Sequence, residues 1–157
     1  GGPEKCRYLT EKLGIDRVID YRAAADMNAA VAEAFPEGVD LYFDNVGGPT
    51  LDVALANIRM KGRIVLCGRI SQTAGSIRYG IIHTGLLIGK RARMEGFIVS
   101  DFNDRYDEAR QWISAKLKSG ELRQQLHVID GLDSAPNGLA MLFRGENIGK
   151  LVVKVAD

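Results

Sequence analysis

Short apolar runs alternate along the chain with longer segments whose apolar residues recur at three- and four-residue spacing. Continuous apolar runs are typical of strands buried on both faces of a parallel sheet, whereas the longer spacing is typical of amphipathic helices. The runs predict strands at 17–21, 40–46, 63–68 and 94–99. Strands that alternate with helices form right-handed βαβ units, so the pattern indicates an α/β fold with a doubly wound, Rossmann-like parallel sheet.

Five helices are expected around these strands, at 3–13, 23–35, 49–58, 81–90 and 104–119. The first of them has Pro3 in its first turn and Gly14 just beyond its last apolar residue, which are ordinary start and stop signals. The last is the most amphipathic, and we expect one face of it to point inward: Tyr106, Ala109, Trp112, Ile113 and Leu117.

The two ends of the chain do not match a complete doubly wound domain. The opening "GGPEKC" enters a helix without a strand before it, so we expect a segment to be missing upstream. After Gly120 the pattern changes to an extended segment at 122–130, a short helix near 134–143 and a closing strand, "KLVVKV". These residues are interpreted as a different layer.

Composition narrows the range of partners. The 157 residues are 46% hydrophobic, which is enough to bury a core, and 21 basic against 20 acidic residues leave a formal net charge of +1. This balance favours small molecules over nucleic acid or a membrane surface. Cys6 and Cys67 form no CxxC motif, so neither a zinc ribbon nor a disulfide framework is expected. A reducing cytoplasm fits these cysteines.

The stretch "LYFDNVGG", residues 41–48, ends a buried strand with an acid, an amide and two glycines. Ligands of open α/β sheets lie beyond the carboxyl ends of the strands. Asn45 can donate and accept there, while Gly47 and Gly48 keep side chains away from an incoming ribose or nicotinamide. A turn without any ligand explains these residues about equally well, and Asp44 can serve simply to brace that turn.

Six segments, taken in order, resemble a known family: "GGPEKCRYLTEKLGID", "VIDYR", "DLYFDNVGG", "GRIVLCGRISQ", "RMEGFIVSDF" and "NIGKLVVKV". Together they resemble the cofactor-binding half of the medium-chain dehydrogenase/reductase superfamily. More narrowly, they resemble its zinc-independent leukotriene B4 dehydrogenase/prostaglandin reductase branch, which reduces enone double bonds with NADPH. The resemblance covers essentially the whole chain.

The resemblance implies how the chain is organised. Residues 1–121 would form a partial NADP-binding Rossmann domain without its first strand and glycine-rich pyrophosphate loop, and 122–157 would return to the catalytic domain. The chain would then be a fragment that lacks the amino-terminal catalytic domain. We expect it to be inactive by itself, to bind NADPH poorly and to self-associate through unpaired strand edges.

The resemblance also implies a cofactor site. Lys5 and Tyr21 resemble the pair that binds the 2′-phosphate, which favours NADP over NAD, although a solvated lysine in a first helical turn is the plainer interpretation. The other cofactor contacts that we expect are Asn45, Cys67, Gly68, Ile70, Ser71, Thr73, Phe97, Ile98, Val99 and Asn147.

Some of these residues also have a purely structural interpretation. We interpret Cys67 as a buried packing residue beside the cofactor and not as a nucleophile, whereas Phe97 fits a core and Asn147 an ordinary turn. Many relatives have tyrosine where this chain has Thr73, so proton delivery and substrate type stay open, and Tyr79 is a possible substitute.

The reaction implied is hydride transfer from NADPH to the C=C bond of an enone or enal, or to a quinone, followed by protonation. No residue is identified as the general acid, so the catalytic residues are unknown, and we expect no metal: His83 and His127 are interpreted as structural. The alternatives are a nucleotide-binding module without catalysis and a methyltransferase. The expected partners are a small-molecule substrate and a second copy of the parent enzyme, in a dimer.

Overall fold

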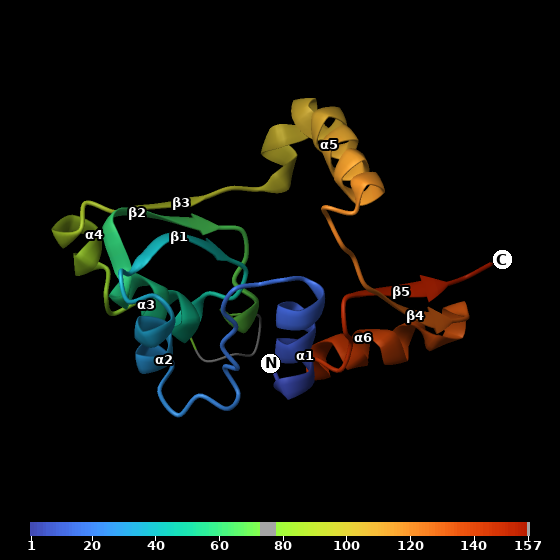
Figure 1. Ribbon diagram of the computed structural model, residues 1–157, viewed down its shortest axis with the longest axis horizontal. Coiled ribbons are helices and arrows are strands. Elements are labelled where there is room, and N and C mark those ends of the chain that lie inside the picture. The colour runs from blue at the N-terminus through green and yellow to red at the C-terminus, as the bar shows by residue number, and fades with distance from the viewer. Residues whose placement is uncertain (73–77, 157) are drawn as a thin grey trace. The chain divides into compact units, whose positions relative to one another are not determined.

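The structure is a computed structural model that describes residues 1–72 and 78–156. The chain forms two compact units: unit 1 comprises Gly1–Val18 with Asp104–Asp157, and unit 2 comprises Ile19–Asn103. Figure 1 shows the elements of each unit along the colour gradient. The expected boundary between residues 121 and 122 stays a prediction.

Unit 2 contains a parallel sheet of three strands in the order β1-β2-β3. These strands are β1 (Val39–Asp44), β2 (Ile58–Leu66) and β3 (Arg93–Gly96), and each lies close to a predicted run. Leu66 is the register partner of both Asp44 and Gly96, so the three carboxyl ends meet at one edge. The expected α/β class with parallel strands is confirmed.

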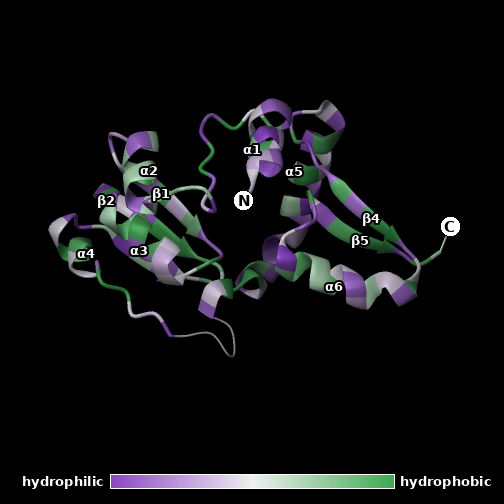
Figure 2. Ribbon diagram, turned by 90° about the horizontal axis from the view of Figure 1, so that it is seen from below, coloured by the Kyte–Doolittle hydropathy of each residue, from purple (hydrophilic) through white to green (hydrophobic). Residues whose placement is uncertain are grey.

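The core of unit 2 lies between this sheet and its helices. Pro49 in the first turn starts α3 (Gly48–Ala56), which buries Leu55 completely against the sheet. Ile58 and Ile64 are 2% and 1% exposed, and burying side chains of this kind contributes about 1.5 to 3 kcal/mol each. Figure 2 shows hydrophobic positions on both α3 and the neighbouring β1.

Two further helices pack against the same core cluster through Val31 and Leu87. The first is α2 (Met27–Ala34), which begins four residues later than predicted, because the Asp26 carboxylate caps it by accepting from the N–H groups of Asn28 and Ala29. The second is α4 (Gly85–Gly89), a shorter helix than the predicted 81–90.

A bulge interrupts the pairing of β1 with β2. Val39 pairs with Ile58 and Leu41 pairs with Arg63, so one residue of β1 lies opposite four residues of β2. A Cβ atom on Gly62 would lie 2.7 Å from the side chain of Ile58, so only glycine lets the bulge pack this closely on the core.

The predicted strand at 17–21 is wrong, because these residues form no strand. A strand needs a neighbour that accepts and donates its ladder hydrogen bonds, and no described strand pairs with this segment. Tyr21 instead lies in a turn and is 58% exposed.

Unit 1 begins with α1 (Pro3–Arg7), which continues as a π-helical turn at Tyr8–Lys12, so the first predicted helix is confirmed. Its sheet pairs β4 (Leu126–Asp130) with β5 (Lys150–Lys154) in parallel. The helix α6 (Ala135–Arg144) connects these strands as a βαβ crossover, and Gly138 lets it approach β4, since a Cβ there would lie 2.6 Å from Ile129.

The remaining helix, α5 (Tyr106–Ser119), does not bury the face that we expected to point inward. Trp112 is 59% exposed and Ile113 is 44% exposed, because α5 makes no extensive contact with another described element. Every helix in the described part of the chain is too short or too polar to cross a bilayer.

Candidate functional site

The carboxyl edge of the unit 2 sheet brings together residues that follow three different strands. Asn45 follows β1, Cys67 and Gly68 follow β2, and Phe97 follows β3. The N–H groups of Cys67 and Gly68 donate to the carbonyl oxygen of Asp44 at 2.8 and 3.0 Å, and the N–H of Phe97 donates to Leu66 at 3.2 Å. The expected convergence of these candidate residues is therefore present.

The Asp44 carboxylate fixes the turn that follows β1. It is fully buried and accepts hydrogen bonds from the N–H groups of Val46 at 2.8 Å and Gly47 at 3.0 Å. The Tyr42 hydroxyl also donates to it at 3.0 Å, and the pKa of Tyr42 is raised first by burial and then by this neighbouring carboxylate. The bracing role considered for Asp44 is confirmed by these contacts.

The two glycines after this turn make room for protein atoms. Gly47 and Gly48 have φ angles of +69° and +58°, in the left-handed region that favours glycine. A Cβ on Gly48 would lie 2.8 Å from the Ser71 hydroxyl, and one on Gly47 would lie 3.1 Å from Cβ of Arg69. The glycines therefore let the loop after β2 pack against the loop after β1.

The loop after β2 is held in the same way by the backbone of the first loop. The N–H of Ile70 donates to the carbonyl of Asn45 at 3.1 Å, and the Ser71 hydroxyl donates to the carbonyl of Val46 at 2.6 Å. The Ile70 side chain is 63% exposed. Thr73, which we also expected to contact a cofactor, lies outside the described residues.

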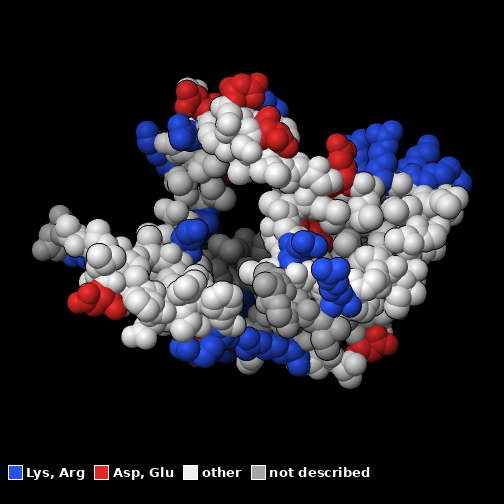
Figure 3. Space-filling model, turned by 180° about the vertical axis from the view of Figure 1, so that it is seen from behind, with Lys and Arg blue, Asp and Glu red and all other residues white. Residues whose placement is uncertain are grey.

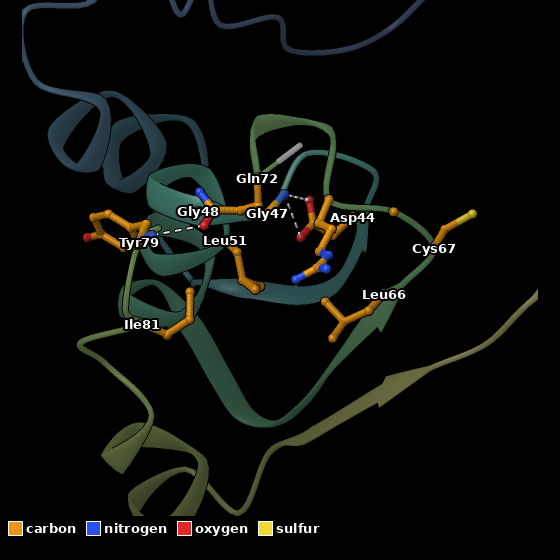
Figure 4. A pocket seen from close by; sticks show the side chains of 11 residues that line it. Asp44, Gly47, Gly48, Leu51, Leu66, Cys67, Gln72, Tyr79 and Ile81 are labelled. Carbon is orange, nitrogen blue, oxygen red and sulfur yellow. Dashed lines mark hydrogen bonds between the residues drawn. The ribbon is translucent and has the colours of Figure 1, made fainter. Parts of the chain in front are cut away.

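A pocket of about 350 Å³ lies between these loops and α3 (Figure 4). Leu51, Leu66 and Ile81 supply apolar lining, and Arg69 and Gln72 supply polar groups. The pocket can accept a flat group that is apolar on its faces and polar at its rim.

The expectation that Cys67 is a buried thiol is wrong. Its side chain is exposed and the thiol is free. In Figure 4 it points away from the other lining side chains. Cys67 directly follows β2, and its backbone N–H bonds to the carbonyl of Asp44, so its side chain is left outside.

The segment after β3 adds exposed apolar surface to this edge. The Phe97 ring lies 6.1 Å from the ring of Phe43 and 5.8 Å from the ring of Phe102. Ile98 and Val99 are 68% and 62% exposed. Exposed aliphatic side chains beside a polar strand end are a suitable surface for a planar ring.

Two of the predicted cofactor residues lie in unit 1. The Lys5 ammonium donates to the carbonyl of Gly145 at 2.6 Å, and the Asn147 amide donates to the carbonyl of Gly149 at 2.8 Å. The structure therefore connects the helix that carries Lys5 to the turn that carries Asn147. Tyr21, the expected companion of Lys5, belongs to unit 2, so that pairing stays a prediction.

Sequence reasoning missed Asp52, a carboxylate on α3 that is only 3% exposed. It accepts the Tyr79 hydroxyl at 2.9 Å and the N–H groups of Ile82 at 3.0 Å and His83 at 2.9 Å, and Nδ1 of His83 lies 3.0 Å from its Oδ1. The available signal was an acid within the apolar run "LDVALANI". Asp52 therefore ties residues 79–83, which form one wall of the pocket, to α3.

These contacts shift the pKa values of Asp52 and Tyr79 in opposite directions. Burial acts to raise the pKa of Asp52, but the hydrogen bonds from His83, Tyr79 and Ile82 outweigh it and hold the pKa below its usual value. The bond to Asp52 is also the main cause of a raised pKa at Tyr79. The Tyr79 hydroxyl donates a hydrogen bond to the Asp52 carboxylate, and the suggestion that Tyr79 replaces a tyrosine at position 73 stays a prediction.

No three His, Cys, Asp or Glu side chains in residues 1–72 and 78–156 gather as a metal site. The carboxyl edge also offers a polar side chain for binding. Asn45 is exposed there and offers an amide that can both donate and accept.

Comparisons with known proteins show the family of this chain. A family described as "Zinc-binding dehydrogenase" matches residues 1–115. The chain is 42% identical over 156 residues to 2-alkenal reductase (NADP(+)-dependent) of Nicotiana tabacum. This match covers 99% of the chain and 46% of that protein. It is 36% identical over 162 residues to the NADPH-dependent curcumin reductase of Escherichia coli, and this match covers 99% of the chain and 47% of the reductase.

A solved structure shows the same similarity. The crystal structure of CurA from Vibrio vulnificus in complex with NADPH has a TM-score of 0.89 and 36% identity, and the match covers 100% of this chain and 48% of that one. The chain thus spans about half the length of the curated relatives that it matches.

Proposed function

The chain belongs to the zinc-binding dehydrogenase family, and from this membership we propose that it is the NADPH-binding part of an enzyme that reduces the activated C=C bond of enones and enals. The observation that carries the proposal is the carboxyl edge of the unit 2 sheet, where loops after three parallel strands converge. Dinucleotides bind at such edges in open α/β sheets. The relatives named above act on alkenals and curcumin, and CurA binds NADPH.

The residues at this edge fit a nicotinamide nucleotide. Ile70, Ile98 and Val99 are each more than 60% exposed, and a planar ring would cover them. The exposed Asn45 amide provides hydrogen bonds for a ribose or a carboxamide. Gly68 has no side chain that would stand between Asn45 and such a group. Cys67, Ser71 and Phe97 are proposed as neighbours of the cofactor, and Thr73 is proposed as a further contact.

NADPH supplies a hydride to the substrate when it is bound. The part of the chain described here binds and orients the cofactor and excludes water from the reacting face. Lys5 and Tyr21 are proposed to bind the 2′-phosphate, and Asn147 is proposed to reach the cofactor from the closing segment. The general acid is not assigned.

Setting and assembly are also part of the proposal. The near-zero formal charge of +1 favours a small-molecule substrate over nucleic acid. Two free cysteines favour a reducing compartment, which we propose is the cytoplasm. We propose that the natural protein is a homodimer without a metal cofactor, and sedimentation together with metal analysis tests both points.

The activity itself is tested by following NADPH oxidation by the natural protein with a small enone. Turnover is expected with NADPH, with a weaker signal from NADH. A saturated ketone of the same carbon skeleton serves as the control, and it should not be reduced. Tight NADPH binding without turnover on any enone, enal or quinone would instead identify a nucleotide-binding module.

Replacing Lys5 by alanine is expected to weaken NADPH binding by about 1 to 3 kcal/mol, which is the loss of a charge-assisted hydrogen bond to a phosphate. NADH has no 2′-phosphate, so its affinity should stay nearly unchanged. Lys12→Ala is the matched control, since this exposed lysine lies further along the same helical segment. Titration of both nucleotides decides the matter: equal losses for NADPH and NADH would mean that Lys5 serves only the carbonyl of Gly145.

A further inference from the structure

Four cations line a second pocket in unit 2, at the end of the sheet where β3 begins. The pocket has a volume of about 380 Å³, and its lining consists of Lys61, Arg63, Arg91 and Arg93. Arg63 and Arg93 are direct register partners on β2 and β3: Arg93 begins β3, and Arg63 lies within β2 at the first residue that pairs with β3. Figure 3 shows Lys and Arg atoms gathered, at upper right, over the end of the sheet from which β2 and β3 start.

Among the described residues, none of the four cations forms an ion pair, although nearby Arg59 pairs with Asp40 at 3.0 Å. The acid next along β3 is Glu95, and its register partner is Val65. Like charges on directly opposed strand positions repel each other, so an anion bound between Arg63 and Arg93 would relieve their repulsion.

The backbone aims two of these cations in a conformation that is unfavourable for their residue types. Lys61 has a φ of +63° and Arg91 a φ of +49°, and no other non-glycine residue in the described part of the chain has a positive φ. Lys61 lies in the bulge of β2, and its N–H donates to the carbonyl of Lys90 at 2.8 Å, which holds the bulge against the turn before β3. Bulges and left-handed residues of this kind concentrate at binding sites, where they redirect side chains.

We propose that this pocket, named here the basic pocket (Lys61, Arg63, Arg91 and Arg93), binds a compact polyanion with two or more phosphate groups. Three guanidinium groups provide planar forks that match phosphate oxygens, and the ammonium of Lys61 adds a point charge. A pocket of this volume suits a small molecule. The site is separate from the proposed NADPH site, because the two pockets share no lining residue among the described residues.

Binding of inorganic triphosphate to the natural protein, measured by titration calorimetry at low ionic strength, tests the proposal. We expect saturable binding of one triphosphate per chain, with an affinity that falls as salt is added. The double variant Arg63→Gln, Arg93→Gln should weaken this binding at least about tenfold, the usual effect of removing charge-assisted hydrogen bonds. The charge control is Lys118→Gln on α5, which should change the affinity less than about twofold.

A second pair of variants keeps the test independent of folding. Lys61→Gly and Arg91→Gly remove charge from the basic pocket while glycine adopts a positive φ without strain, so both variants should fold and should bind triphosphate more weakly. Saturating NADPH should leave triphosphate binding unchanged. Competition between the two ligands, an equal effect of Lys118→Gln, or no saturable binding below millimolar concentration would each overturn the proposal. Failure of the NADPH assay would leave this result unaffected.

Discussion

Replacing Asp52 by alanine is expected to lower the free energy of unfolding of the natural protein by about 3 to 5 kcal/mol, the range seen when one partner of a buried ionic network is removed. The variant leaves the Tyr79 hydroxyl and the N–H groups of Ile82 and His83 without their acceptor. Urea unfolding measures the loss, and the amide protons of Ile82 and His83 should exchange faster with solvent.

The matched control is another acid of unit 2, which forms an ion pair on the surface. Asp40 pairs with Arg59 on the surface, and its side chain is 74% exposed, so Asp40→Ala should cost less than about 1 kcal/mol. Asp52→Asn keeps one acceptor oxygen and should fall between the two. Equal costs for Asp52→Ala and Asp40→Ala would show that the buried network contributes no more than a surface pair.

The same carboxylate makes stability depend on pH in a defined direction. The hydrogen bonds hold the folded-state pKa of Asp52 below its usual value of 3.8, so its contribution is fully present above that pH. The contribution is lost as the pH falls through the lower folded-state pKa. Unfolding curves of the natural protein and of Asp52→Asn should therefore converge as the solution is acidified below about pH 4.

Replacing Gly149 by alanine should cost about 2 to 5 kcal/mol, the sum of left-handed backbone strain and forced displacement of packed atoms. Gly149 has a φ of +78°, and a Cβ atom there would lie 2.2 Å from the carbonyl oxygen of Gln125. That oxygen accepts the N–H of Lys150 at 2.8 Å, so the clash falls on the first hydrogen bond between β4 and β5.

Gly131 provides the control for this prediction. Its φ is +79°, but a Cβ there would meet nothing within 4 Å, so Gly131→Ala pays only the backbone strain of about 1 to 2 kcal/mol. The difference between the two variants in urea unfolding isolates the clash with Gln125. A difference below about 0.5 kcal/mol would mean that the strand start can move aside freely.

The elements that could be predicted from the sequence are those whose signals are local. The run at 40–46 and the glycines after it define β1 and its loop, and the convergence of strand ends then follows from parallel pairing. The start of α2 could have been read from Asp26, a capping residue directly before the helix.

Other failures depend on partners that lie far away in the sequence. The segment 17–21 has strand-like composition, but no described strand pairs with it, and α5 makes no extensive contact with another described element. Asp52 was missed because its hydrogen-bond donors lie 27 to 31 residues further along the chain. Periodicity reports which side of an element is apolar, but it does not report what covers that side.

Unit 1 is built from two segments that lie on either side of unit 2 in the sequence, and this order affects folding during synthesis. Residues 1–18 leave the ribosome before unit 2, whereas the residues that complete unit 1 follow it. The carbonyl of Gly145 that accepts the Lys5 ammonium, and the strand β5 that pairs with β4, are both made near the end of this stretch. Unit 2 can therefore fold during translation before the partners of the helix at 3–12 have been synthesised. Unit 1 then forms after unit 2.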